Sequence, residues 1–153
     1  MRLALYEPEI PQNTGTLLRT AACLNLNVDI VEPCGFVFSD KHLKRAGMDY
    51  LDLAKVERHN DWQAFSELRQ TQQGRRVVLL TTKGAVPYTE FAFQADDVLL
   101  LGQEGAGVPD SVHAQVDARI TIPMAPEARS LNVAVAAAMV LGEALRQTNK
   151  FPD

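Results

Sequence analysis

Short runs of apolar residues alternate along the chain with segments whose apolar residues recur at helical spacing. Five of these runs predict β-strands, at residues 3–6, 27–31, 76–82, 97–102 and 118–123. Two of the strands are apolar at almost every position, as expected when helices cover both faces of a parallel sheet. The pattern therefore predicts an α/β fold, a single domain over residues 1–153, with a mostly parallel central sheet and helices on both faces.

The predicted helices are preceded by residues that commonly cap a helix, namely Asn13, Ser39, Asn60 or Asp61, and Ser130. The last helix is unusual because residues 133–142 carry no polar side chain. A helix that is apolar all round must be covered on every side. Ten residues are too few to span a bilayer, so the cover has to be the protein's own core or a second copy of the chain.

Charge and composition limit the partners. The formal net charge of −4 argues against non-specific attraction to nucleic acid, so an RNA partner must meet a local basic patch. Lys41, Lys44 and Arg45 share one face of a predicted helix and are candidates for that patch, although such a face is often simply solvated. The apolar run before Glu7 is too short for a signal peptide and two cysteines suit a reducing compartment, so we expect a cytoplasmic protein without membrane contact.

Several classes of site lack their motifs. The three histidines, His42, His59 and His113, lie far apart in the sequence, and neither they nor the cysteines show metal-ligand spacing, so no metal site is predicted. The phosphate loop G-x-x-x-x-G-K-[ST], the dinucleotide fingerprint G-x-G-x-x-G and the serine elbow G-x-S-x-G do not occur at the required places. An unrelated nucleotide-binding regulator, which would need a phosphate loop, is therefore disfavoured.

Three loops that follow predicted strands carry the candidate chemistry. The first, residues 11–19, reads P-Q-N-T-G-T-L-L-R. The second, residues 99–110, places three glycines around Glu104 at the carboxyl end of a strand, where open α/β sheets bind ligands. The third, residues 122–132, reads I-P-M-A-P-E-A-R-S-L-N, and its two prolines stiffen it, which reduces the entropy lost on binding. Each loop has an ordinary structural reading by itself, but the three together favour a ligand site.

The patterns N-T-G-x-x-x-R, L-x-x-G-x-E-x-x-G and I-P-M-x-P-x-x-R-S-L-N resemble the three motifs of the SPOUT superfamily, knotted methyltransferases that use S-adenosylmethionine. The resemblance covers essentially the whole chain. Four further stretches, LYEPEIPQNTG, VEPCGF, DKHLKRAGMDY and LTTKG, are similar to the small TrmL (YibK) group, which methylates the ribose of a tRNA wobble nucleotide.

This resemblance implies a SPOUT α/β knot, in which the C-terminal segment threads through a loop to form a trefoil, although knots are otherwise rare. It implies S-adenosylmethionine-dependent 2′-O-methylation of cytidine or uridine 34, with the tRNA anticodon stem-loop as partner. Two alternatives stay open: a SPOUT 2′-O-methyltransferase acting on another tRNA or rRNA position, and a knotted RNA-binding protein without catalysis.

Residue roles follow from the same resemblance. The cofactor is assigned to Leu80, Thr81, Gly102, Glu104, Gly107, Ile122, Met124, Ser130 and Leu131. The catalytic set is Arg19, Asn13, Glu104, Ser130 and Asn132, and the substrate-binding set is Arg19, Lys41, Lys44, Arg45 and Arg129. A guanidinium is a hydrogen-bond donor rather than a base. We therefore expect Arg19 to stabilise the developing alkoxide or to bind the adjacent phosphate, with Glu104 as an alternative base.

The resemblance further implies a homodimer through the C-terminal helix, residues 130–147. We expect Ala137 and Val140 at the contact between the two copies. The chain departs from the usual pattern of the group at Ala134, Val135 and Gly142, all near the expected dimer and substrate surface.

Overall fold

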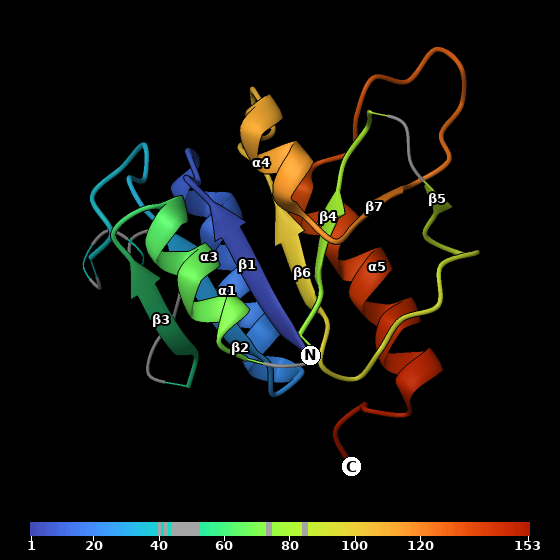
Figure 1. Ribbon diagram of the computed structural model, residues 1–153, viewed down its shortest axis with the longest axis horizontal. Coiled ribbons are helices and arrows are strands. Elements are labelled where there is room, and N and C mark those ends of the chain that lie inside the picture. The colour runs from blue at the N-terminus through green and yellow to red at the C-terminus, as the bar shows by residue number, and fades with distance from the viewer. Residues whose placement is uncertain (40, 42, 44–52, 73–74, 84–85) are drawn as a thin grey trace.

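A computed structural model describes residues 1–39, 41, 43, 53–72, 75–83 and 86–153, and within these ranges seven strands form one sheet (Figure 1). The strands are β1 (Arg2–Tyr6), β2 (Asn27–Val31), β3 (Lys55–His59), β4 (Val77–Leu80), β5 (Val86–Pro87), β6 (Val98–Leu101) and β7 (Ala118–Thr121). Their order is β3-β2-β1-β6-β4-β7-β5, and each neighbouring pair is parallel. The predicted parallel α/β sheet is confirmed, whereas the trefoil knot stays a prediction.

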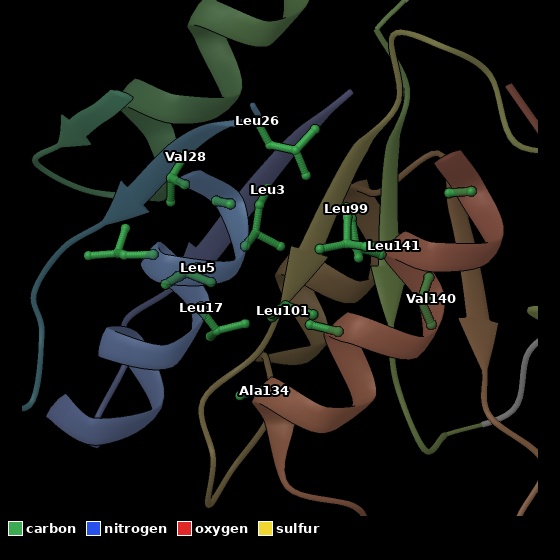
Figure 2. Close-up of a cluster of buried hydrophobic side chains, with 14 of the residues drawn as sticks. Leu3, Leu5, Leu17, Leu26, Val28, Leu99, Leu101, Ala134, Val140 and Leu141 are labelled. Carbon is green, nitrogen blue, oxygen red and sulfur yellow. The ribbon is translucent and has the colours of Figure 1, made fainter. Parts of the chain in front are cut away.

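Alternate residues of the central strands enter two separate hydrophobic cores. Leu3 and Leu5 of β1 pack on one face with α1 (Pro11–Cys23) and α5 (Val133–Thr148), whereas Ala4 and Tyr6 face α3 (Trp62–Gln70) and α4 (Asp110–Gln115). Figure 2 shows the first core, in which Leu17 of α1 and Leu141 of α5 approach the same strands. Helices thus cover both faces of the sheet, which explains why β4 and β6 are apolar throughout.

The structure confirms one predicted helix start and corrects two others. Asp61 caps α3, since its Oδ1 accepts a hydrogen bond from the Ala64 N–H at 2.8 Å. The start of α1 is not Asn13, because Ile10 is the N-cap and Pro11 occupies the first turn, where its missing N–H costs nothing. Nor does Ser130 cap the last helix.

The cap of α5 is Asn132, whose Oδ1 accepts from the N–H groups of Ala134 and Val135 at 2.9 and 3.3 Å. A local signal could not separate Ser130 from Asn132, because both residue types are favourable caps. The helix expected after Ser39 lies largely outside the described residues, although the Leu43 N–H donates to the Ser39 carbonyl at 3.1 Å.

Sequence patterning missed the two edge strands. β3 reads K-V-E-R-H, and its charged side chains are those of a strand that is paired on one side only. β5 consists of two residues, and Pro87 is compatible with a strand at the edge of a sheet. Neither strand has the continuous apolar run on which the other predictions depended.

The apolar surface of α5 is divided between the core and solvent. Ala137 and Val140 are 0% exposed and face the core of the same chain, so their expected position at a dimer contact is wrong. The large exposed apolar residues are instead Val135 and Met139 of α5 and Leu131 just before it, and Val135 is 51% exposed. Within the described ranges no helix combines the length and apolarity needed to cross a membrane.

Candidate functional site

The carboxyl ends of β4, β6 and β7 open into a cleft of about 500 Å³. This is the edge of an open α/β sheet where ligands are expected. Its walls come from the loops after these three strands, from the starts of α1 and α5, and from His113 of α4. The nine residues that the resemblance assigned to the cofactor all line it, namely Leu80, Thr81, Gly102, Glu104, Gly107, Ile122, Met124, Ser130 and Leu131.

The loop after β6, residues 102–107, closes on itself through its backbone. The Gln103 N–H donates to the Gly107 carbonyl at 2.8 Å, and the Gly107 N–H donates back to the Gln103 carbonyl at 3.0 Å. Gly107 has a φ of +66°, and a Cβ on Gly102 would lie 2.6 Å from the carbonyl carbon of Gly107. This closure therefore requires glycine at both positions, for the left-handed backbone at one and the close approach at the other.

The starts of α1 and α5 meet at the rim of the cleft. Asn132 Nδ2 donates to Asn13 Oδ1 at 2.9 Å, while Asn132 Oδ1 is occupied by the N–H groups of its own helix. Both asparagines line the cleft. One side chain thus caps α5 and binds α1, so the first turns of two helices that are distant in sequence are fixed relative to each other.

Glu104 projects from the loop after β6 toward the loop before α1. Its carboxylate oxygens accept from the backbone N–H groups of Glu9 and Ile10 at 2.9 and 3.2 Å. In return, Glu9 Oε2 accepts from the Gly105 N–H at 3.2 Å. Beside them, Gln103 Nε2 donates to Glu7 Oε2 at 3.1 Å. Each of the two loops is therefore held in place by side chains of the other loop.

The basic residues expected to contact substrate are not part of the cleft lining. Arg19 lies on the exposed side of α1, six residues and therefore about 9 Å beyond Asn13 along the helix. Arg129 and Lys41 are also exposed and outside the lining. Lys44 and Arg45 fall outside the described residues. Of the predicted catalytic set, the structure brings together Asn13, Glu104, Ser130 and Asn132, and it places Arg19 apart from them.

The lining also includes residues that had been given no role from the sequence, among them Ile10, Lys83 and His113. Thr81 Oγ1 lies 3.4 Å from His113 Nε2 and accepts from the Lys83 N–H at 3.1 Å. Ile10 and Lys83 lie within stretches that carried the family resemblance, so that signal was present. No spacing pattern pointed to His113, because α4 brings it to the cleft only through the fold.

A second polar cluster lies under the other half of the sheet. Asp29 is fully buried and accepts from Arg2 at 2.8 and 2.9 Å, and its Oδ1 lies 2.8 Å from His59 Nε2. Burial acts to raise the pKa of Asp29, but hydrogen bonds with Arg2 and His59, together with the positive charges of Arg2 and Arg69, outweigh it and leave the pKa lowered. Ligand atoms of Asp29, Glu57 and His59 lie within 4.8 Å of one another.

That spacing would suit a metal ion, although no sequence motif pointed to it. The charges oppose such a site, because the guanidinium groups of Arg2 and Arg69 already pair with the Asp29 carboxylate, and Arg2 also pairs with Glu57. The cluster is best described as a buried ion network that connects β1, β2, β3 and α3.

The Cys34 thiol is not a ready nucleophile. Cys23 and Cys34 are free thiols. Burial, with the negative charge of Glu32 close by, raises the pKa of the Cys34 thiol to about 11. A protonated thiol is a poor nucleophile, so Cys34 is a structural residue at neutral pH.

Comparison with known proteins places these features among RNA methyltransferases. A family model described as the SpoU rRNA Methylase family matches residues 1–142. A protein of Beijerinckia indica named tRNA (cytidine(34)-2'-O)-methyltransferase is 61% identical over 145 residues, which cover 95% of this chain and 90% of that protein.

Solved structures share the fold. One, described as giving insights into the 2-OH methylation of C/U34 on tRNA, matches with a TM-score of 0.87 and 40% identity over 95% of this chain and 94% of that chain. The AdoMet-bound rRNA methyltransferase of Sinorhizobium meliloti matches with a TM-score of 0.83 and 31% identity, covering 95% of this chain and 55% of that chain.

Proposed function

The chain belongs to the SpoU rRNA Methylase family, and on that premise we propose that it transfers a methyl group from S-adenosylmethionine to the ribose 2′-oxygen of nucleotide 34 of tRNA, a cytidine or uridine. One observation carries the proposal. The nine residues assigned to the cofactor, drawn from four segments between Leu80 and Leu131, gather in a single cleft. The active unit is one methyltransferase domain over residues 1–153.

The cleft fits this cofactor in size and in chemistry. Its volume of about 500 Å³ is within the range of pockets that hold ligands of this size. Leu80, Ile122 and Leu131 offer apolar walls for an adenine ring, and the backbone of residues 102–107 offers donors and acceptors beside them. When bound, S-adenosylmethionine supplies a methyl group activated by its sulfonium.

The protein then contributes chiefly by positioning. Correct placement of two reactants can lower a barrier by about 7 to 11 kcal/mol. Asn13, Ser130 and Asn132 lie at the rim of the cleft and offer polar side chains there. We assign to Arg19 the binding of the phosphate next to the reacting ribose, or stabilisation of the developing alkoxide, since its exposed position favours contact with RNA over contact with the cofactor.

The anticodon stem-loop is the proposed RNA partner. Lys41 and Arg129 are exposed cations on the described part of the chain, and Lys44 and Arg45 add two more in the sequence. A few phosphate contacts on a protein with a net charge of −4 imply modest affinity that falls with added salt. The free thiols of Cys23 and Cys34 suit the reducing cytoplasm, where we place the reaction.

A homodimer through the C-terminal helix completes the proposal. Leu131, Val135 and Met139 form an exposed apolar face on one side of α5 and its start, at the i, i+4, i+8 spacing of a helix stripe. A second copy of the same helix is a suitable cover for this stripe, because a two-fold contact buries the same residues on both partners.

The test is methylation of tRNA by the purified protein with S-adenosylmethionine, followed by mapping of ribose-methylated positions by mass spectrometry. We expect the modification at nucleotide 34, and its loss in tRNA from a strain lacking the protein. Methylation at another tRNA position or in rRNA would replace the assigned target. Cofactor binding without transfer to any RNA would favour a non-catalytic binding protein. Arg19→Ala should reduce turnover strongly while cofactor binding measured by calorimetry is kept.

A further inference from the structure

The loop before α1 and the loop after β6 are joined by carboxylates that point in opposite directions. Glu104 reaches from the second loop to the backbone of the first, and Glu9 reaches from the first to the backbone of the second. We propose that Glu9 and Glu104 form a reciprocal clamp that positions the start of α1 over the cofactor cleft, with Glu104 acting as a positioning residue rather than as the base. The proposal rests on the proposed function and refines the roles within it.

The geometry of the clamp is specific to these two side chains. Glu104 uses both oxygens, with Oε2 2.9 Å from the Glu9 nitrogen and Oε1 3.2 Å from the Ile10 nitrogen. Glu9 Oε2 lies 3.2 Å from the Gly105 nitrogen. A Cβ on Gly105 would lie 3.3 Å from Glu9 Oε2, so glycine gives the carboxylate room to approach the backbone there. Three hydrogen bonds thus connect segments 95 or so positions apart.

Acting as a base conflicts with acting as the clamp. A base must accept a proton, and a protonated carboxyl oxygen becomes a donor. In this structure each oxygen of Glu104 faces a backbone N–H, which is itself a donor. Proton uptake would therefore weaken the attachment of α1 at the moment when the reacting groups must be held. The carboxylate form of Glu104 is therefore the form that attaches the start of α1 to the loop after β6.

The clamp acts on the part of α1 that carries the substrate-facing residues. Ile10 is the N-cap of α1 but offers no side-chain hydrogen bond, so the carboxylate of Glu104 supplies the anion that a helix start favours. One turn later, Asn13 is bound by Asn132. The first turn of α1 is thus fixed on one side by the cofactor loop and on the other by α5, and Arg19 is carried by the same helix.

This arrangement connects the two substrates of the reaction. The loop of residues 102–107 lines the cofactor cleft, while Arg19 lies on the exposed side of α1. A bound cofactor that orders the loop would order the start of α1 through Glu104 and Glu9. Glu9 itself does not line the cleft, so its removal breaks the bond to the Gly105 N–H and leaves the cleft lining unchanged.

The experiment compares Glu9→Ala, Glu9→Gln, Glu104→Ala and the double variant Glu9→Ala/Glu104→Ala with the wild-type protein. Glu9→Gln is the matched control, because its amide oxygen can still accept from the Gly105 N–H. We expect Glu9→Ala to lower kcat on the order of 10- to 100-fold, as misplacement of reacting groups does, with cofactor affinity by calorimetry changed much less. We expect Glu9→Gln to keep most of the activity and the double variant to resemble Glu104→Ala.

A base role for Glu104 predicts a different result. Glu9→Ala would then leave kcat and its pH profile near those of the wild type, and only the Glu104 variants would lose turnover, which would overturn the clamp. Loss of kcat in Glu9→Gln equal to that in Glu9→Ala would also overturn it, because the amide preserves the hydrogen bond. Thermal melting of each variant shows that the comparison is between folded proteins.

Hydrogen exchange gives a readout that needs no RNA. S-adenosylmethionine should slow amide exchange across residues 9–14 in the wild-type protein and have little effect there in the double variant. If the wild-type protein methylates no tRNA at nucleotide 34, the proposed function fails while this exchange difference still supports the clamp. Equal cofactor-induced protection of residues 9–14 in both proteins contradicts the clamp whatever the activity.

Discussion

Replacing Gly102 by alanine tests the closed conformation of the cofactor loop with one added methyl group. The new Cβ would lie 2.6 Å from the Gly107 carbonyl carbon and 2.7 Å from its Cα, whereas ordinary contact begins at 3.4 Å. The obstructing atoms are backbone, so no side chain can rotate away. The backbones of residues 102 and 107 must therefore move apart by about the difference between 3.4 and 2.6 Å.

The size of the effect follows from the two hydrogen bonds that close the loop. A bond of 2.8 Å between Gln103 N and the Gly107 oxygen, lengthened by that amount, no longer meets the geometry of a hydrogen bond. Each backbone hydrogen bond contributes about 0.5 to 1.5 kcal/mol net. Loss of both, together with the displaced backbone groups, should weaken cofactor binding by about 1 to 3 kcal/mol, or roughly 5- to 150-fold.

Isothermal calorimetry with S-adenosylmethionine measures this change directly, and Gly142→Ala is the matched control. A Cβ on Gly142 meets nothing within 4 Å, and the residue lies inside α5. That variant should bind cofactor normally and gain about 0.5 to 1 kcal/mol of stability from better helix propensity. A folded Gly102→Ala protein with a dissociation constant within twofold of the wild type would refute the assignment of this loop to the cofactor.

The remaining predictions concern the ion network, the start of α5 and the dimer. Asp29→Asn should lower the free energy of unfolding by about 3 to 5 kcal/mol in urea titrations, because it removes the buried carboxylate charge that pairs with Arg2 and Arg69. The pKa of Asp29 in the folded protein lies below 3.8, so the extra stability of the wild-type protein over Asp29→Asn is complete above the unfolded pKa and is lost as the pH falls through the lowered value. A stability difference that grows on acidification would contradict this. Asn132→Ala should cost about 1 kcal/mol as a lost cap and reduce kcat, and unchanged melting and turnover would argue against both roles. Val135→Glu should give a folded monomer by light scattering, whereas Ala137→Glu should fail to fold because its side chain is fully buried, and a dimeric Val135→Glu protein would reject the proposed interface.

Central strands were predictable from the sequence because burial on both faces forces them to be apolar. β4 and β6 are examples, and the structure confirms both. β3 was missed because its outer edge faces solvent and its side chains take part in the ion network around Asp29. An isolated polar segment carries no signal for strand pairing, since the pairing is decided by the neighbour that it meets after folding.

Helix starts and helix faces show a second limit. Asn13 is a good capping residue by type, yet the N-cap of α1 lies three residues earlier, at Ile10, because Pro11 and the distant carboxylate of Glu104 provide for its first turn. In an all-apolar helix the sequence also cannot tell core from surface, so Val140 was assigned to the wrong side. Both errors concern contacts made across the fold.

The sequence pointed to the loops of the candidate site but not to the hydrogen bonds that join these loops. Motif resemblance identified loops that the structure assembles into one cleft, and it assigned Gly102 and Gly107 to that cleft. It gave no role to Glu9, whose partner is the Gly105 backbone N–H, and none to His113. Every residue except proline has a backbone N–H, so a side chain that binds one requires no particular residue type at the partner position. For this reason the clamp was visible only in the three-dimensional structure.

The walls of the cleft are drawn from positions that extend from Ile10 to Ala136. During synthesis, a nascent chain therefore lacks a complete cofactor site until nearly all of its residues have left the ribosome. A chain that ended before Asn132 would lack one wall of the cleft, and we expect it not to bind the cofactor.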